Sequence, residues 1–222
     1  MITFTAGERA GAGYLALPRQ GGGPGVLVLH AWWGLTPTFK AVCDRLARAG
    51  FVALAPDLYH GRTAATIAEA EALMEQRDFD AMRATATGAL AYLRAHPATQ
   101  GYPAGALGFS MGASWAIFLS SVAPDDIAAA VAFYGSEATD FAAARAAYLG
   151  HFAEDDEWEP AEGVRQMEAD IRAAGRDVAF FTYPGARHWF AEPDRPEFDQ
   201  AAAELAWQRT VTFLHEQLGR SE

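Results

Sequence analysis

Ser110 lies at the centre of the pentapeptide GFSMG, residues 108–112. A Gly-x-Ser-x-Gly sequence between a strand and a helix is typical of a nucleophilic serine on a sharp, strained turn. The flanking glycines allow neighbouring chains to approach that turn, and the helix N-terminus favours a developing oxyanion. The alternative is a small-residue turn, because a chance match in a chain of this composition has a probability of roughly one in twenty.

A nucleophilic serine needs a base, and six histidines could supply one. His188 follows the predicted strand VAFFTY and precedes the last helical segment, so we expect it to reach Ser110. His151 belongs to the strand-like segment YLGHF, which favours a buried core histidine. His96 and His215 lie at a helix end and in an amphipathic helix, where surface or capping roles are expected.

The orienting acid should follow a strand between the serine and the histidine. The segment LGHFAEDDEWEP supplies Glu154, Asp155 and Asp156 at that place. One carboxylate would hydrogen-bond the imidazole and fix its tautomer, and the other two would form a solvated acidic loop. Spacing alone does not choose among the three.

These side chains require a sheet that brings strand ends together, and strand-like and helix-like segments alternate along the chain. This alternation predicts parallel crossovers and a single doubly wound α/β domain over residues 1–222, without a large cap domain. The expected strands are at 2–6, 13–18, 26–30, 51–58, 105–109, 127–135, 146–152 and 177–185, and the helical regions at 36–49, 64–96, 111–122, 160–175 and 199–218.

Composition excludes several classes of function. The formal net charge of −11 argues against nucleic-acid binding, because that affinity depends on Lys and Arg side chains that neutralise phosphates. No signal-like N-terminus or bilayer-length apolar run occurs, so we expect a cytoplasmic protein with no membrane partner, as a monomer or small homo-oligomer. Cys43, the single cysteine, falls on a helical stretch and is expected to be a buried packing residue.

The chain resembles the dienelactone hydrolase family of α/β-hydrolases over nearly its whole length. The resemblance rests on VLVLHAWWGLTP, FVALAPDLY, GALGFSMGAS, VAFYG, LGHFAEDDEWEP and YPGARHWF. It implies Ser110 as nucleophile, His188 as base and, through the pattern H-F-x-E-x-D-x-x-x-P, Asp156 as acid. It also implies that the backbone N–H groups of Met111 and Trp32 form the oxyanion hole.

Several positions depart from the family's pattern. Its namesake enzymes carry a cysteine where this chain has Ser110, and a glutamate where it has Ala31. Losing both together is chemically coherent, because a serine hydroxyl has no thiolate to manage. A substrate-binding arginine is replaced by Glu192, and Arg62 is near but not in register with a second one. These differences argue against a carboxylate-bearing lactone as substrate.

The expected function is hydrolysis of a small carboxylic ester or lactone through an acyl-enzyme, without cofactor or metal. A small aromatic pocket is expected, in which about half of the loop aromatics contact ligand. Short acyl groups or compact lactones would fit it best. Its candidate residues are Trp33, Tyr59, Tyr134 and Trp189, with Trp32 and Trp158 beside them.

Three alternatives remain. The same triad would serve a thioesterase or a peptidase, since the chemistry of acyl transfer is shared. A catalytically silent binding module could keep the fold, although it would have no physical need for all three triad residues. A metal enzyme built on His30, Asp57 and His60 is disfavoured, because these residues lack the spacing of a metal-binding motif.

Overall fold

The computed structural model describes residues 1–219, and residues 220–222 of the expected domain lie outside the described residues. One eight-stranded sheet forms the centre, in the order β1-β2-β4-β3-β5-β6-β7-β8. The first two strands run antiparallel to their neighbours, and every pairing from β4 to β8 is parallel. The predicted doubly wound α/β fold is therefore confirmed.

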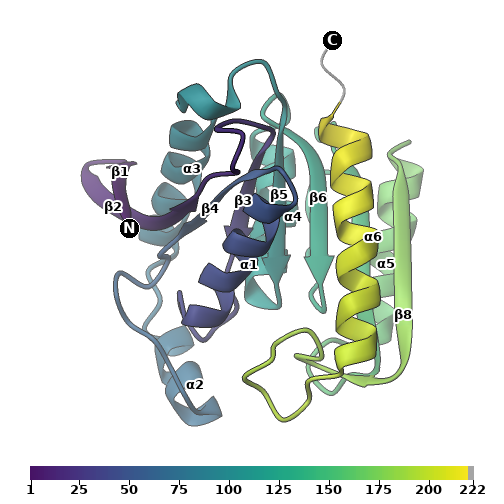
Figure 1. Ribbon diagram of the computed structural model, residues 1–222. Coiled ribbons are helices and arrows are strands. Elements are labelled where there is room, and N and C mark those ends of the chain that lie inside the picture. Colours follow the sequence, from purple (N-terminus) through teal and green to yellow (C-terminus); the bar gives the residue numbers. More distant parts are fainter. Residues whose placement is uncertain (220–222) are drawn as a thin grey trace.

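The elements alternate along the chain much as the sequence predicts (Figure 1). The strands are β1 (Ile2–Ala6), β2 (Arg9–Ala16), β3 (Gly25–Leu29), β4 (Val52–Pro56), β5 (Ala104–Phe109), β6 (Ile127–Phe133), β7 (Ala147–Asp155) and β8 (Val178–Arg187). The helices are α1 (Pro37–Arg48), α2 (Ile67–Glu75), α3 (Phe79–Ala95), α4 (Met111–Val122), α5 (Ala161–Ala173) and α6 (Gln200–Leu218), with a short 3₁₀ helix at Pro97–Thr99.

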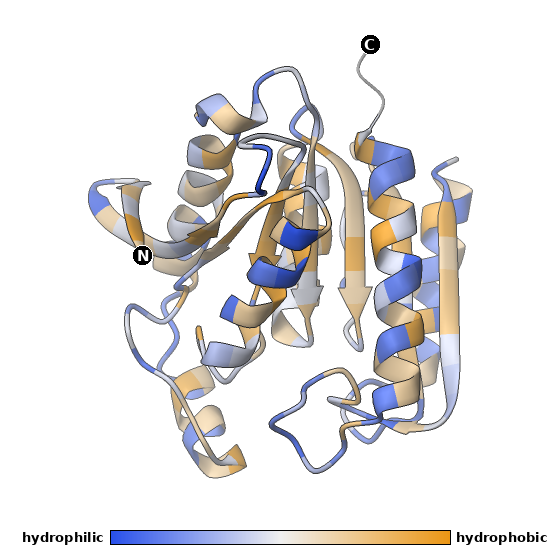
Figure 2. Cartoon of the chain, viewed as in Figure 1, coloured by the Kyte–Doolittle hydropathy of each residue, from blue (hydrophilic) through white to orange (hydrophobic). Residues whose placement is uncertain are grey.

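Two hydrophobic cores lie on the two faces of the sheet. Helices α1 and α6 cover one face, and α3, α4 and α5 cover the other (Figure 1). The central strands β3, β4 and β5 are buried at every position. Figure 2 shows these strands as largely apolar and the outer sides of the helices as polar, as expected for a sheet covered on both faces.

The N-terminal hairpin differs from the sequence prediction. The second strand is predicted at 13–18, but β2 begins at Arg9, ends at Ala16 and includes Gly11. A Cβ atom at Gly11 would overlap the ring of Phe4 on β1, so this glycine allows the ring to cross the strand. Gly11 therefore serves close packing within the strand.

The region 64–96, which the sequence predicts to be one or two helices, forms two. Thr66 begins α2 with a capping box in which its hydroxyl accepts from the Glu69 N–H, and the Glu69 carboxylate accepts from the Thr66 N–H. Asp78 caps α3 by accepting the Ala81 N–H. The chain therefore leaves the helical conformation after residue 75 and begins a new helix at Phe79. The connection between α2 and α3 lies beside α4 and lines a cavity there.

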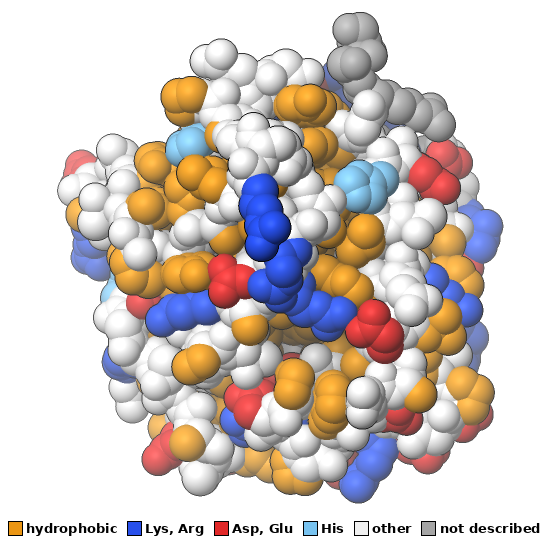
Figure 3. All heavy atoms as spheres, in the orientation of Figure 1, with side chains coloured by type: hydrophobic (Ala, Val, Ile, Leu, Met, Phe, Trp, Pro, Cys, Tyr) orange, Lys and Arg blue, Asp and Glu red, His pale blue; other side chains and the backbone are white. Residues whose placement is uncertain are grey.

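The distribution of charged side chains on the surface and the apolar character of the helices bear on the kinds of partner that the protein could have. Acidic side chains are scattered over the face shown in Figure 3, between basic and apolar ones, rather than gathered into one patch. Within residues 1–219, no helix combines the length and the apolar character that crossing a bilayer requires.

Candidate active site

Ser110 occupies a strained turn between β5 and α4. Its φ of 50° and ψ of −117° lie outside the regions that a non-glycine residue normally adopts. The Ser110 N–H donates to the Phe133 carbonyl at 2.9 Å, which ties the turn to the end of β6. Backbone strain that the surrounding structure holds in place is common at functional sites.

The two glycines of the pentapeptide have separate steric roles. A Cβ atom at Gly108 would overlap the backbone of Gly112, the second residue of α4. A Cβ atom at Gly112 would overlap the carbonyl groups of Leu29 and His30, at the end of β3. Both positions must be glycine for α4 to begin this close to β3 and β5, as the Gly-x-Ser-x-Gly pattern predicts.

Ser110, His188 and Asp156 form a continuous hydrogen-bonded chain. The Ser110 Oγ lies 3.1 Å from His188 Nε2, and His188 Nδ1 lies 2.8 Å from each carboxylate oxygen of Asp156. The side chains of His188 and Asp156 are each only 5% exposed. Such a chain can move a proton from the serine to the imidazole while the carboxylate stabilises the imidazolium.

The structure distinguishes the three adjacent carboxylates that spacing left open. Asp156 directly follows β7 and also accepts the N–H groups of Trp158 and Glu159 at 2.9 Å, which fix its orientation. Glu154 instead accepts the Gly185 N–H at 2.8 Å on β8, and Asp155 is an exposed residue paired within the sheet. Only Asp156 of the three contacts His188 in the described residues.

The expected oxyanion donors come from the start of α4 and from the loop after β3. Met111 is the first residue of α4, where no earlier carbonyl of the helix can accept its N–H. Trp32 lies in the neighbouring loop, which His30 holds in place. The His30 Nδ1–H donates to the Ala31 carbonyl at 2.7 Å, and Nε2 accepts the Leu58 N–H at 3.1 Å.

These two hydrogen bonds and the burial of His30 determine its protonation state. Burial lowers the pKa of His30, so the ring is a neutral imidazole with one donor and one acceptor. Both ring nitrogens are engaged with backbone, although sequence reasoning considered this residue only as a metal ligand. Across residues 1–219, no cluster of three His, Cys, Asp or Glu side chains has the arrangement of a metal site.

The expected pocket aromatics occupy two different environments. Trp189 lines a cavity of about 160 Å³ beside His188, together with Trp32 and Trp158. Trp33, Tyr59 and Tyr134 are instead at most 2% exposed and line neither cavity that contains Ser110. Their assignment to the pocket is therefore corrected: these three rings are core residues.

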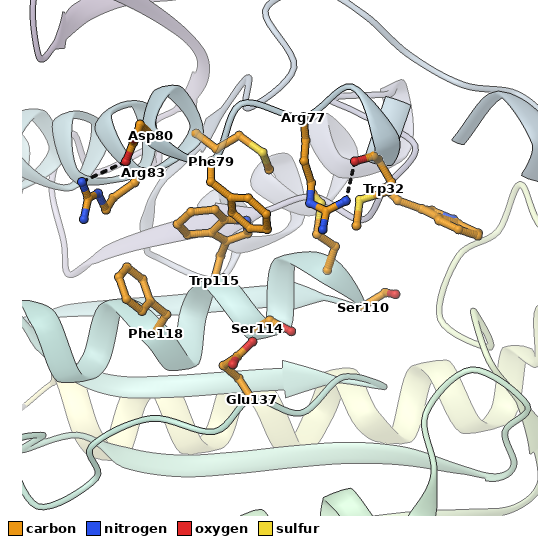
Figure 4. A pocket seen from close by; sticks show the side chains of 13 residues that line it. Trp32, Arg77, Phe79, Asp80, Arg83, Ser110, Ser114, Trp115, Phe118 and Glu137 are labelled. Carbon is orange, nitrogen blue, oxygen red and sulfur yellow. Dashed lines mark hydrogen bonds and ion pairs between the residues drawn. The ribbon is translucent and has the colours of Figure 1, made fainter. Parts of the chain in front are cut away.

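A larger cavity was not foreseen from the sequence. It has a volume of about 500 Å³ and extends from Ser110 between the α2–α3 connection and α4 (Figure 4). Phe79, Trp115 and Phe118 form its far walls. The expectation of a small pocket is corrected, because a cavity of this size accommodates a drug-sized molecule. The exposure of Phe79, at 57%, is a feature that only the fold reveals.

Glu192 does not present a charge to substrate. Its alignment with a substrate-binding arginine of the family had suggested that it would. Its side chain is 1% exposed and accepts a hydrogen bond from the Tyr134 hydroxyl at 2.9 Å. Burial raises the pKa of Glu192 to about 8, although the Tyr134 hydrogen bond acts against this shift. The Tyr134 ring in turn contacts the His188 ring, with centroids 4.9 Å apart. Glu192 is therefore connected to His188 through one intervening side chain, that of Tyr134.

Two other polar residues serve the core, as the sequence predicted. His151 is fully buried, with its ring nitrogens bonded to the hydroxyls of Thr210 and Tyr183, and burial lowers its pKa to about 3. Cys43 is fully buried in α1, and burial raises the pKa of its thiol. Arg62 lies at the surface and hydrogen-bonds Gln76, outside both cavities at Ser110.

Comparisons with known proteins identify the relatives of this chain. A family model described as "Dienelactone hydrolase family" matches residues 12–218. "Protein usf" of Aquifex pyrophilus is 33% identical over 98% of each chain. "Carboxymethylenebutenolidase 1" of Cupriavidus pinatubonensis is 28% identical, covering 96% of this chain and 94% of that protein. A solved structure named "m3DLH" has 27% identity and a TM-score of 0.87, covering 98% of this chain and 97% of its own.

Proposed function

This chain belongs to the dienelactone hydrolase family and is an ester or lactone hydrolase, and we propose that it acts through a Ser110-His188-Asp156 triad and an acyl-enzyme. The observation that carries this proposal is the hydrogen-bonded chain from the Ser110 hydroxyl through His188 to Asp156. The relative named as a carboxymethylenebutenolidase supports a lactone or ester carbonyl as the group attacked, since a butenolide is a cyclic ester.

In the first half-reaction, the Ser110 oxygen attacks the substrate carbonyl carbon while its proton passes to His188 Nε2. The carbonyl electron pair moves to oxygen, and the N–H groups of Met111 and Trp32 stabilise the resulting oxyanion. When that pair returns, the bond to the leaving oxygen breaks and His188 donates its proton to the departing alkoxide. The products of this step are an alcohol and an acyl-Ser110 ester.

In the second half-reaction, water replaces the alcohol. His188 takes a proton from water, and the hydroxide attacks the acyl carbon. The new tetrahedral species collapses, Ser110 regains its proton from His188, and the carboxylic acid leaves. For a lactone, the alcohol and the acid belong to one ring-opened product.

Asp156 has a positioning role throughout. It accepts the Nδ1–H of His188, which leaves Nε2 free to accept the serine proton in the resting state. When His188 is protonated, the adjacent carboxylate stabilises its charge in a site where both side chains are almost fully buried. The two backbone donors to Asp156 keep that carboxylate aligned with the ring.

The experiment compares wild-type protein with Ser110→Ala on short-chain p-nitrophenyl esters and on matched thioesters. We expect kcat/KM to fall by at least about 10⁴-fold in the variant. Ser121→Ala is the matched control, because Ser121 lies on the same helix but lines neither cavity at Ser110. Undiminished hydrolysis in Ser110→Ala would reject the proposed nucleophile.

A fluorophosphonate probe separates the enzyme from a silent binding module. A folded silent module would not react, whereas the oxygen of an activated Ser110 attacks the phosphorus of the probe, which releases fluoride as the P–F bond breaks. The ratio of ester to thioester kcat/KM then distinguishes an esterase from a thioesterase, which the triad geometry alone does not.

A further inference from the structure

Two cavities meet at Ser110 and differ in their neighbours. The larger, of about 500 Å³, runs between the α2–α3 connection and α4, and His188 is not among its lining residues. The smaller, of about 160 Å³, is bounded by His188, Trp158 and Trp189. Since Ser110 lines both, a substrate whose carbonyl sits at this serine can extend into both at once.

The geometry of the tetrahedral intermediate determines which part of the substrate enters each cavity. Its central carbon carries the Ser110 oxygen, the oxyanion, the leaving oxygen and the acyl chain. The leaving oxygen must lie within reach of His188 Nε2, because His188 supplies the proton that releases it. The leaving group therefore occupies the small cavity beside His188, and the acyl chain takes the direction of the large one.

The walls of the large cavity are predominantly apolar. Phe79 and Trp115 face each other from α3 and α4, with ring centroids 6.4 Å apart, and Phe118 contacts Trp115 edge-on at 5.7 Å (Figure 4). Three methionines also line this cavity: Met74, Met82 and Met111. Flexible thioethers and aromatic faces suit an extended hydrocarbon or aryl chain.

The basic groups at this cavity already have partners. Arg83 forms an ion pair with Asp80 at 3.0 Å, visible in Figure 4. The Arg77 guanidinium donates to the Met74 carbonyl and stacks 4.5 Å from the Phe79 ring centroid. Among the described residues, Arg77 and Arg83 each have a protein partner, and the Nε of Arg77, which makes no hydrogen bond, is buried. An uncharged chain requires no arginine.

We infer that the substrate is an uncharged ester with an elongated apolar or aryl acyl chain and a compact alcohol. The acyl chain lies between Phe79, Trp115 and Phe118, and the alcohol lies beneath Trp158 and Trp189. This inference rests on the proposed serine hydrolase mechanism and goes beyond it in assigning each half of the substrate. It also differs from the compact substrate expected from the sequence, because the volumes of the two cavities are unequal.

A pair of isomeric esters tests this assignment. Ethyl 4-phenylbutanoate carries the phenyl group on the acyl side, and 4-phenylbutyl acetate carries it on the alcohol side, with the same atoms overall. We expect kcat/KM to be about 10- to 100-fold higher for the ethyl ester, the effect of burying one phenyl group on the favoured side. Equal rates, or preference for the acetate, would overturn the inference.

Two variants locate the chain in the cavity. Phe79→Ala and Phe118→Ala should each lower the preference for ethyl 4-phenylbutanoate by about 3- to 10-fold, with smaller effects on ethyl acetate. The side chain of Phe79 is exposed, so its removal leaves the core intact. Phe198→Ala, a comparably exposed phenylalanine outside both cavities, is the control.

The outcomes separate the two proposals. An unchanged isomer preference in both cavity variants would contradict the placement of the acyl chain, while hydrolysis itself would still support the serine mechanism. If wild-type protein hydrolyses neither isomer and its Ser110 does not react with a fluorophosphonate, the proposed function fails and the substrate assignment fails with it.

Discussion

Replacing Glu192 by glutamine perturbs a buried carboxyl group that Tyr134 connects to His188. Glu192 Oε1 accepts the Tyr134 hydroxyl, and Oε2 is buried without a hydrogen-bond partner among the described residues. An ionised carboxylate would be costly there, and burial accordingly raises the pKa from 4.5 to about 8. Glutamine keeps the shape and the acceptor oxygen but has no proton to lose.

The sign of the effect follows from proton binding in the two states. Between pH 4.5 and 7, the unfolded chain loses the Glu192 proton while the folded protein retains it, so ionisation favours unfolding as the pH rises. The raised pKa thus contributes stability below pH 4.5 that is lost as the pH approaches 8. At about 1.4 kcal/mol per pH unit, the wild type loses about 3 kcal/mol between pH 4.5 and 7 through this group.

Urea unfolding of both proteins at intervals from pH 4.5 to 7 measures this loss. The free energy of unfolding of Glu192→Gln, relative to wild type, should rise by about 3 kcal/mol across the range. Glu204→Gln is the control, because its carboxylate is half exposed and its ion pair with Arg45 contributes at most about 1 kcal/mol. A flat difference between Glu192→Gln and wild type, or a falling one, would refute the argument.

Three further perturbations probe the site. Asp156→Asn should lower kcat by about 10⁴-fold on p-nitrophenyl acetate with unchanged circular dichroism, since Nδ1 loses its anionic acceptor; a decrease below tenfold would contradict this role. Gly112→Ala should lower the free energy of unfolding by at least about 2 kcal/mol in urea, because the new methyl group overlaps the β3 carbonyls; unchanged stability would contradict that contact. Tyr134→Phe should cost about 1–3 kcal/mol in the same assay at pH 6, because Glu192 Oε1 loses its donor, and an unaltered midpoint would argue against that bond.

The sequence predicted the fold and the strand ends because both depend on local patterns. Apolar runs alternating with helical periodicity specify a parallel sheet, and parallel strands place their carboxyl ends at one edge. Ser110, Asp156 and His188 follow β5, β7 and β8 in the expected order, and the structure brings them within hydrogen-bonding distance. Choosing Asp156 required the family pattern or the fold, because three adjacent carboxylates look alike in the sequence.

The pocket was harder to predict because its walls come from distant segments. Phe79 begins one helix and Trp115 lies in another, and only tertiary packing makes them face each other. Similarly, no local signal shows whether a loop aromatic such as Tyr134 points toward ligand or into the core. Glu192 was interpreted by its charge alone, whereas its burial changes both its protonation and its direction.

The most direct test of the account is identification of the covalent intermediate. Wild-type protein mixed with p-nitrophenyl acetate is quenched in acid within the first turnovers, digested, and analysed by peptide mass spectrometry. We predict a mass increase of one acetyl group on the peptide containing Ser110, with fragment ions that assign it to this serine, and none in Ser110→Ala. An acetyl group on a different residue during turnover, or full turnover by Ser110→Ala, would contradict it.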